Sequence, residues 1–211
     1  MTEVVYVTWK KAVQLCYRLA KKIANSRYRP DAVVSIMRGG VVPALVVSDI
    51  LNVDSFYAVR VKHWGIAEEL YPVPVIEQLP QGKIENKRVL LVDEVADTGK
   101  TLEVALRELS KLAPREIRTA VLHLKPTSVV TPDYYAEKLE KWIWIFYPWS
   151  LAETLIALSV RELKSGDAAE SELLEASINL ARKLGIKASV TDILKMSIEY
   201  YAREIKESRR K

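Results

Sequence analysis

The chain has 211 residues, of which 49% are hydrophobic and 28% charged, and its net charge is +5 at pH 7. These values are ordinary for a soluble globular protein of one domain, or one domain with an appendage. No apolar run is long enough to span a bilayer, and the N-terminus lacks a signal peptide's apolar core, so we expect a cytoplasmic protein without a membrane partner. The single cysteine, Cys16, excludes an intramolecular disulfide and a cysteine-based metal cluster.

Hydrophobic periodicity predicts alternating helices and strands before residue 150. Helices are expected at 9–25 (after an N-cap at Thr8), 43–51 and 101–112. Strands are expected at the short apolar or β-branched runs 32–37, 55–62, 88–92, 119–124 and 142–146. The proline-rich stretch between the second and third strands predicts a long loop with room for a β-arm. This alternation indicates an α/β fold with a doubly wound, mostly parallel sheet of about five strands.

The composition changes after residue 149. Three amphipathic helices are expected there, at residues 151–164, 168–184 and 189–207. Asp167 and Glu170 have the spacing of a capping box, and Gly185 is expected to end the second helix. We therefore predict an α/β domain over residues 1–149 and a C-terminal three-helix subdomain over residues 150–211.

An apolar strand, two acids and a polar turn follow one another in residues 89–101, Val-Leu-Leu-Val-Asp-Glu-Val-Ala-Asp-Thr-Gly-Lys-Thr. Backbone amides and hydroxyls at the start of the following helix can bind phosphate. The adjacent acids Asp93 and Glu94 can accept hydrogen bonds from ribose hydroxyls or act through Mg2+. A simple helix cap does not explain two acids after a fully apolar strand, and the spacing is not that of a Walker A loop. The segment therefore predicts a sugar-phosphate site.

The same segment resembles the signature of type I phosphoribosyltransferases, which is a hydrophobic strand, two acids, an aliphatic residue and Asp-Thr-Gly-x-Thr. The resemblance implies that Asp93 and Glu94 bind the ribose 2- and 3-hydroxyls of phosphoribosyl pyrophosphate (PRPP). It also implies that Asp97 relays a proton at N7 of a purine base. The turn that would cradle the 5-phosphate comprises Ala96, Asp97, Thr98, Gly99, Lys100 and Thr101.

A second segment extends the resemblance to 6-oxopurine enzymes. Met37, Arg38, Gly39 and Gly40 resemble the pyrophosphate loop, in which the family uses a non-proline cis peptide and in which Arg38 would contact pyrophosphate. Alone, Arg-Gly-Gly is typical of a plain turn. Its position directly after the first strand of the sheet favours the pyrophosphate loop.

Two more segments resemble parts of the same enzymes. Lys125 matches the lysine that donates to the exocyclic oxygen of a 6-oxopurine, although by itself it would be taken for a surface lysine. The residues Trp144, Ile145 and Phe146 resemble the base-binding hood, where an aromatic ring stacks on the purine, although their periodicity alone indicates a core strand. The family's flexible loop, which closes over the transition state, would contain Lys62, His63 and Trp64.

The resemblance implies transfer of the 5-phosphoribosyl group from PRPP to N9 of a purine, with release of pyrophosphate and formation of a nucleoside monophosphate. Asp93, Glu94 and Asp97 would contribute positioning and electrostatic stabilisation rather than covalent catalysis. Mg2+ is the expected cofactor, held mainly through the substrate and otherwise by Asp93, Glu94 or Glu153. Because dimers are usual in the family, we expect a homodimer.

The base has two alternatives. Asp97 and Lys125 indicate a 6-oxopurine, namely hypoxanthine, guanine or xanthine. Ser150, however, stands where 6-oxopurine relatives carry a metal-binding acid, and Glu153, one helical turn later, is a candidate replacement. The helical tail resembles that of archaeal adenine phosphoribosyltransferases. On this resemblance we favour adenine, with AMP as product, and keep a 6-oxopurine as the alternative.

A PRPP-responsive regulator that binds nucleic acid is an alternative of another class, because residues 180–193 have a helix-turn-helix-like rhythm. Acidic residues interleave the basic ones in this tail, which weakens a nucleic-acid-binding face. We therefore favour a helical lid or dimerisation bundle and do not expect nucleic acid as a partner. A pyrimidine enzyme is disfavoured because Lys125 and the hood at Trp144 together build a slot for a two-ring base.

Overall fold

The structure is a computed structural model that describes residues 3–62, 73–80, 83–163, 169–186 and 190–208, with side chains up to Tyr201. Its described residues from Thr8 to Trp142 form one compact unit. Those up to Val7 and from Ile143 onward form a second. Among the described residues, no helix combines the length and the apolar character needed to cross a membrane.

The larger unit contains a six-stranded sheet with the order β4-β3-β2-β5-β6-β7. Its strands are β2 (Ala32–Met37), β3 (Phe56–Lys62), β4 (Val75–Gln78), β5 (Arg88–Ala96), β6 (Glu116–Leu124) and β7 (Tyr134–Lys138). All neighbours are parallel except β3 and β4, which are antiparallel. The mostly parallel sheet is thus confirmed, and the expected β-arm is the edge strand β4.

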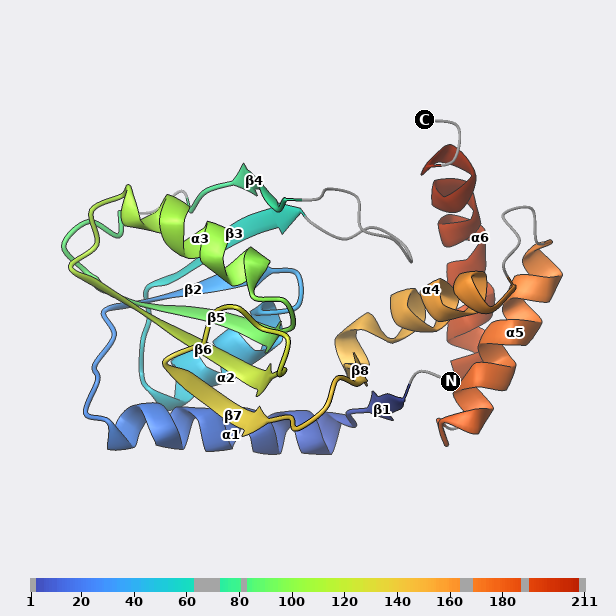
Figure 1. Cartoon of the computed structure of the whole chain (residues 1–211), viewed down its shortest axis with the longest axis horizontal. Helices are drawn as coiled ribbons and strands as arrows, with labels where there is room; N and C mark the ends of the chain where they lie inside the picture. The colour runs from blue at the N-terminus through green and yellow to red at the C-terminus, as the bar shows by residue number, and fades with distance from the viewer. Residues whose placement is uncertain (1–2, 63–72, 81–82, 164–168, 187–189, 209–211) are drawn as a thin grey trace. The chain divides into compact units, whose positions relative to one another are not determined.

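Helices cover both faces of this sheet, as a doubly wound fold requires. They are α1 (Trp9–Asn25), α2 (Val41–Ile50) and α3 (Lys100–Ser110). Figure 1 shows α1 and α2 on one face and α3 on the other. The predicted N-cap of α1 is confirmed, because the Thr8 side chain accepts a hydrogen bond from the Lys11 amide at 3.2 Å. A core that includes Val34, Leu91 and Leu109 fills the α3 side.

The smaller unit combines a two-stranded sheet with the C-terminal helices. Strand β1 (Val4–Tyr6) pairs in parallel with β8 (Trp144–Phe146). A short 3-10 helix, η1 (Pro148–Ser150), precedes α4 (Leu151–Leu163), α5 (Glu170–Lys183) and α6 (Val190–Ser208). Buried apolar residues from β8 and all three helices, among them Phe146, Leu155, Leu173 and Leu194, form one core. The three predicted helices are confirmed.

Two sequence expectations about strands were wrong. Residues 142–146 do not supply a strand of the main sheet, because β8 pairs with β1 in a separate two-stranded sheet and its Phe146 packs into the helical core. The edge strand of the main sheet is instead β7, Tyr-Tyr-Ala-Glu-Lys, whose polar and aromatic residues gave no apolar run. The second compact unit resumes at Ile143. The boundary between two domains after residue 149, expected from the change in composition, stays a prediction.

The ends of α5 follow local capping rules. Gly185 has a φ of 69°, and its amide donates to Arg182 O while the Ile186 amide donates to Ala181 O. These two bonds are the Schellman pattern that glycine favours, so the predicted stop is confirmed. At the other end the Ala169 amide donates to Glu172 Oε2 at 3.1 Å. The predicted partner of Glu170, Asp167, lies outside the described residues.

Candidate active site

The acid pair belongs to the central strand β5. Residues Val89 to Val92 are completely buried, so the strand is fixed between β2 and β6 before it reaches Asp93 and Glu94. Both acids are half-buried at the carboxyl end of the sheet, where ligands of doubly wound folds bind. Desolvation raises the pKa of Asp93 to about 7, and a hydrogen bond from the Glu94 amide to Asp93 Oδ1 (2.7 Å) acts in the opposite direction.

The turn after β5 exposes the amino end of α3. Gly99 has a φ of 81° and precedes the first helical residue, Lys100. Any side chain at Gly99 would be strained by this φ and would collide with Ser128 Oγ and the Val130 amide. The first amides of an α-helix have no partner within the helix, so those beginning at Lys100 and Thr101 can bind an anion. The structure thus forms a tight turn and a helix start at the residues predicted to cradle the 5-phosphate, and this segment is called the phosphate-binding turn below.

The predicted pyrophosphate loop lies directly against the acid pair. The Met37–Arg38 peptide bond is cis, as the resemblance implied. A Cβ atom at Gly39 would overlap the Glu94 carboxyl group, and one at Gly40 would overlap the Val92 carbonyl oxygen. Because β2 and β5 are adjacent strands, the loop after β2 lies close to Glu94 and Val92. Only glycine leaves room for this close packing. The Arg38 residue is exposed at the same loop.

Three side chains donate hydrogen bonds to Asp97. Lys125, which follows β6 and is only 4% exposed, donates from Nζ to Asp97 Oδ2 at 2.6 Å. The indole of Trp142 donates from Nε1 to Asp97 Oδ1 at 3.0 Å. The Thr127 hydroxyl donates to the Asp97 carbonyl oxygen, also at 3.0 Å. Lys125 is therefore a buried cation beside Asp97 and not the surface lysine that its sequence position alone indicated.

The loop that carries Lys125 also contacts the phosphate-binding turn. The Val129 amide donates to the Thr98 carbonyl oxygen at 2.9 Å. The loop and the turn are therefore held together by backbone as well as side-chain hydrogen bonds. Sequence reasoning identified Asp97 and Lys125 but missed Thr127 and Trp142, because neither belongs to a recognised motif.

The hood residues lie in the smaller unit. Phe146 is completely buried in the helical core, with its ring edge-on to Tyr6. Its side chain is therefore part of the core, and only its backbone could contact a base. Trp144 and Ile145 are half-buried, and the Arg161 guanidinium lies 5.5 Å from the centre of the Trp144 ring.

The remaining predicted residues are placed as follows. Lys62 ends β3 and forms an ion pair with Glu77 at 3.3 Å. Its neighbours in the predicted flexible loop, His63 and Trp64, lie outside the described residues. In the smaller unit Ser150 closes η1, and Glu153 lies half-buried in the first turn of α4.

The part of the chain that the structure describes has no group of three or more His, Cys, Asp or Glu residues that could hold a metal ion by itself. Asp93 and Glu94 nevertheless suit Mg2+, which commonly binds through one or two carboxylates together with substrate phosphates and water. The close approach of Glu94 to Gly39 in the predicted pyrophosphate loop fits a metal that arrives with a phosphorylated substrate.

A mostly parallel sheet with an acid pair, a helix start able to bind an anion and a glycine loop at its carboxyl end is the arrangement expected of proteins that bind sugar phosphates. Residues 6–154 match the sequence model of one such family, described as "Phosphoribosyl transferase domain". The chain belongs to this family.

Individual relatives agree with this assignment. The chain is 34% identical over 123 residues to a xanthine-guanine phosphoribosyltransferase of Cereibacter sphaeroides, covering 57% of this chain and 70% of the relative. It is 40% identical to the crystal structure of a purine phosphoribosyltransferase from Pyrococcus horikoshii, with a TM-score of 0.60 over 70% of this chain and 93% of that one. A hypothetical protein from Neisseria gonorrhoeae with bound ppGpp is 28% identical, with a TM-score of 0.62 over 71% and 90%.

Proposed function

We propose that this chain is a purine phosphoribosyltransferase that transfers the 5-phosphoribosyl group of PRPP to N9 of a 6-oxopurine. The observation that carries the proposal is the pair formed by Lys125 Nζ and Asp97 Oδ2, a donor and an acceptor 2.6 Å apart at the carboxyl end of the sheet. A 6-oxopurine presents its O6 acceptor and its N7–H donor side by side on one edge. Lys125 and Asp97 complement that edge, whereas the exocyclic amine of adenine would face the Lys125 ammonium as a second donor.

The named relatives support the same base. Xanthine-guanine enzymes are among the curated relatives, and the ppGpp bound to the Neisseria protein carries guanine. These comparisons favour the 6-oxopurine alternative over adenine, which Ser150 and the helical tail suggested. The homodimer and the cytoplasmic location stay predictions, and AMP, the product expected from adenine, is replaced in this proposal by the monophosphate of a 6-oxopurine.

In the proposed reaction each part of the site has one task. The start of α3 binds the 5-phosphate, the loop at Arg38 binds pyrophosphate, and Asp93 and Glu94 accept hydrogen bonds from the ribose hydroxyls. The bond between C1 and the pyrophosphate oxygen breaks with its electrons on pyrophosphate, and the N9 lone pair forms the new bond to C1. Asp97 accepts the proton from N7 of the base. The two acids also stabilise the positive charge that develops on the ribose.

Asp93 and Glu94 are the residues that would hold Mg2+ together with the substrate. When bound, the ion supplies neutralisation of charge on the leaving pyrophosphate. Glu153, the other predicted metal residue, lies in the smaller unit and stays a prediction.

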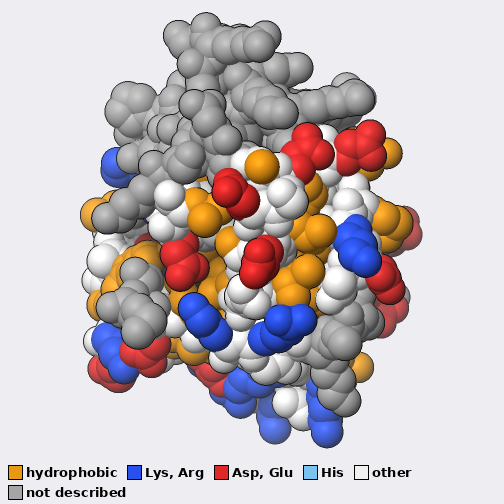
Figure 2. Space-filling model, turned by 90° about the vertical axis from the view of Figure 1, so that its right-hand side faces the viewer, with side chains coloured by type: hydrophobic (Ala, Val, Ile, Leu, Met, Phe, Trp, Pro, Cys, Tyr) orange, Lys and Arg blue, Asp and Glu red, His pale blue; other side chains and the backbone are white. Residues whose placement is uncertain are grey.

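The regulator alternative gains no supporting observation. Figure 2 shows acidic and basic side chains mixed with hydrophobic ones on the face that contains the C-terminal helices. Up to Tyr201, where the description of side chains ends, the exposed charged residues of α5 and α6 are Glu170, Glu172, Glu175, Arg182, Lys183, Asp192, Lys195 and Glu199. Because acidic residues outnumber basic ones in this set, the described side chains of these helices form no continuous basic face for nucleic acid.

Release of pyrophosphate from PRPP with hypoxanthine, guanine, xanthine or adenine, each offered separately with Mg2+, tests the proposal. A site built around O6 rejects a base that lacks this acceptor, so we expect at least one oxopurine to exceed adenine in kcat/KM by about 100-fold. Turnover of adenine as fast as any oxopurine would contradict the choice of base. Release with none of the four would contradict the transfer reaction.

Lys125→Met sharpens the test, because it retains the length of the side chain and removes the ammonium. It should lower kcat/KM for the preferred oxopurine by about 100-fold. The ratio of kcat/KM for the oxopurine to kcat/KM for adenine should therefore become smaller. Lys138→Met, at the exposed end of β7, is the matched control and should change neither value. An unchanged ratio in Lys125→Met would show that Lys125 does not read the base.

A further inference from the structure

Trp142 contacts both members of the charged pair proposed to meet the base. Its indole N–H donates to Asp97 Oδ1 at 3.0 Å, across 45 positions of sequence. The Lys125 Nζ lies 4.5 Å from the centre of the same indole ring, a cation–π distance. One side chain thus binds the carboxylate through its edge and the ammonium through its face.

These contacts restrict how Asp97 can turn. Lys125 holds Oδ2 and Trp142 holds Oδ1, so rotation of the carboxylate about its last bond would break both hydrogen bonds. The Thr127 hydroxyl holds the backbone of the same residue through the carbonyl oxygen at 3.0 Å and makes a longer contact to Oδ1 at 3.3 Å, so the Trp142 indole is the nearer donor to Oδ1. With both carboxylate oxygens and the backbone held, the acceptor is oriented before a base arrives. Such preorganisation is what a proton acceptor in a transition state requires.

Trp142 also restricts the position of the Lys125 ammonium. Lys125 is almost completely buried, and its flexible four-carbon stem would otherwise allow several positions for Nζ. The indole face on one side and Asp97 on the other leave Nζ beside the carboxylate. A smaller side chain at position 142 would remove this aromatic face from beside the Lys125 ammonium.

We propose that Trp142 is a positioning residue, which holds Asp97 and Lys125 in the arrangement that receives the N7 and O6 edge of the base. This inference rests on the proposed function, because it assigns Trp142 a role through the two residues that contact the base. Trp142 itself acts through its hydrogen bond to Asp97 and its ring contact with Lys125.

Trp142→Phe is the test, because it removes the N–H donor and keeps a ring under Lys125. We expect kcat with the preferred oxopurine to fall about tenfold while KM for PRPP stays within twofold, since the phosphate-binding turn and the glycine loop are untouched. Trp9→Phe is the matched control, because this tryptophan is 54% exposed on α1 and is not one of the residues of the proposed site; its kinetics should equal those of the wild type. An unchanged kcat in Trp142→Phe would overturn the inference.

A double-mutant cycle separates positioning from a general structural effect. In the Asp97→Asn background the residue through which Trp142 acts is already impaired, so adding Trp142→Phe should lower kcat by less than twofold. If Trp142→Phe instead costs the same factor in both backgrounds, or raises KM for PRPP as much as it lowers kcat, Trp142 is merely structural. Wild-type protein that turns over no base would refute the proposed function, a result distinct from either outcome for Trp142.

Discussion

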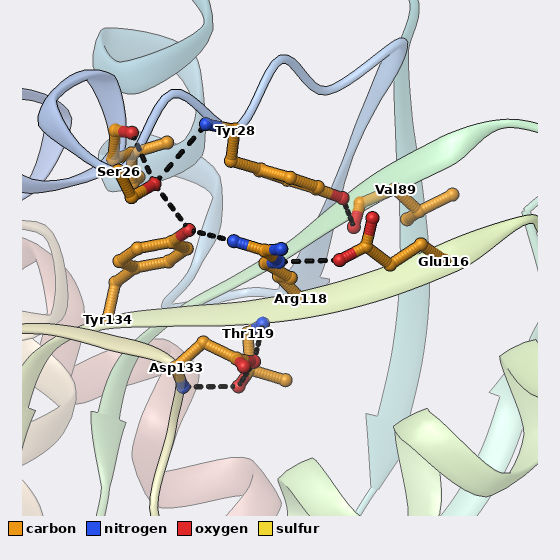
Figure 3. Close-up of polar contacts among 9 residues, drawn as sticks. Ser26, Tyr28, Val89, Glu116, Arg118, Thr119, Asp133 and Tyr134 are labelled. Atoms are coloured by element: carbon orange, nitrogen blue, oxygen red, sulfur yellow. Dashed lines mark hydrogen bonds and ion pairs between the residues drawn. The ribbon is translucent and has the colours of Figure 1, made fainter.

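Strand β6 carries a charged cluster at each end, and the two clusters differ in what they join. At its amino end Arg118 donates to Glu116 Oε1 (2.6 Å) and to the Tyr134 hydroxyl (2.8 Å), with its guanidinium 4.4 Å from the centre of the Tyr28 ring (Figure 3). At its carboxyl end Lys125 and Trp142 converge on Asp97. Both clusters combine a cation, an acid and aromatic rings.

The Arg118 cluster connects elements of the fold. The Tyr28 hydroxyl donates to the Val89 carbonyl oxygen inside the sheet, and the Tyr134 hydroxyl also contacts Ser26 at the end of α1 (Figure 3). Burial is the largest cause that raises the pKa of Tyr28 above its usual range, so its hydroxyl stays neutral. These contacts tie the end of α1 to strands β5, β6 and β7.

The Asp97 cluster lies on loops beyond the strands, next to the acid pair and the phosphate-binding turn. The carboxyl ends of parallel strands are where such folds bind ligands. A cluster of charged and aromatic side chains therefore does not by itself indicate a functional site. Its position relative to the strand ends and to other ligand-binding groups decides whether it serves stability or chemistry.

The largest effect is expected at Asp97. Asp97→Asn keeps the shape of the side chain but removes the proton acceptor, so kcat should fall by about 100- to 1,000-fold. KM for PRPP should stay nearly unchanged, because the acid pair and phosphate-binding turn remain. Steady-state pyrophosphate release measures both. Unchanged turnover with lost PRPP affinity would contradict the role of Asp97.

Arg118→Met should instead lower stability. It removes two charge-assisted hydrogen bonds and a cation–π contact from a partly buried cluster, so the free energy of unfolding should fall by about 2 kcal/mol. Urea unfolding followed by circular dichroism measures this change. Arg107→Met, on the exposed face of α3, should stay within about 0.5 kcal/mol of the wild type. An equal loss in both variants would show that the Arg118 cluster contributes nothing specific.

A smaller effect on stability is expected at His123, the next-to-last residue of β6. Burial lowers the pKa of His123 to about 4, although the neighbouring Glu137 carboxylate opposes this shift and Lys11 adds to it. Below its unfolded-state pKa of about 6.5 the unfolded chain binds a proton that the folded chain does not. The His123 contribution to stability therefore falls as pH drops from 6.5 toward 4, by about 1 kcal/mol at pH 5.5.

Urea unfolding at pH 7.5 and 5.5 measures this effect in wild-type protein and in His123→Gln. The variant lacks the titrating group, so its free energy of unfolding should depend less on pH by about 1 kcal/mol over that range. Carboxylates away from His123 remain in both proteins and cancel in the difference, whereas Glu137, 3.5 Å from His123 Nε2, contributes to it. Identical pH dependence in the two proteins would mean that His123 is not buried in its neutral form.

Local patterns explain which features could be predicted from the sequence. The acid pair, the turn at Gly99 and the glycine loop at Gly39 each lie within one short segment, where strand burial and backbone geometry restrict the residue types. The end of α5 at Gly185 is equally local. These features were predicted at the residues where the structure has them.

The features that could not be predicted from the sequence depend on contacts between residues far apart in the chain. Strand β1 is three residues long and pairs with a strand some 140 positions away, so no local pattern marks either partner as a separate sheet. The burial of Phe146 depends on the helices that follow it. Trp142 reaches Asp97 only because the loops after β5 and β7 meet at one edge of the sheet.

The most direct test of the contrast between the two ends of β6 is to measure kcat and the free energy of unfolding together for Asp97→Asn and Arg118→Met. We predict that folded Asp97→Asn loses at least 100-fold in kcat, and that it also loses some stability because the nearly buried Lys125 ammonium keeps only a neutral partner at position 97. Arg118→Met should lose about 2 kcal/mol of stability and retain wild-type kcat at a temperature where it is folded. Loss of turnover in folded Arg118→Met, or full turnover in Asp97→Asn, would contradict the assignment of chemistry to one end and stability to the other.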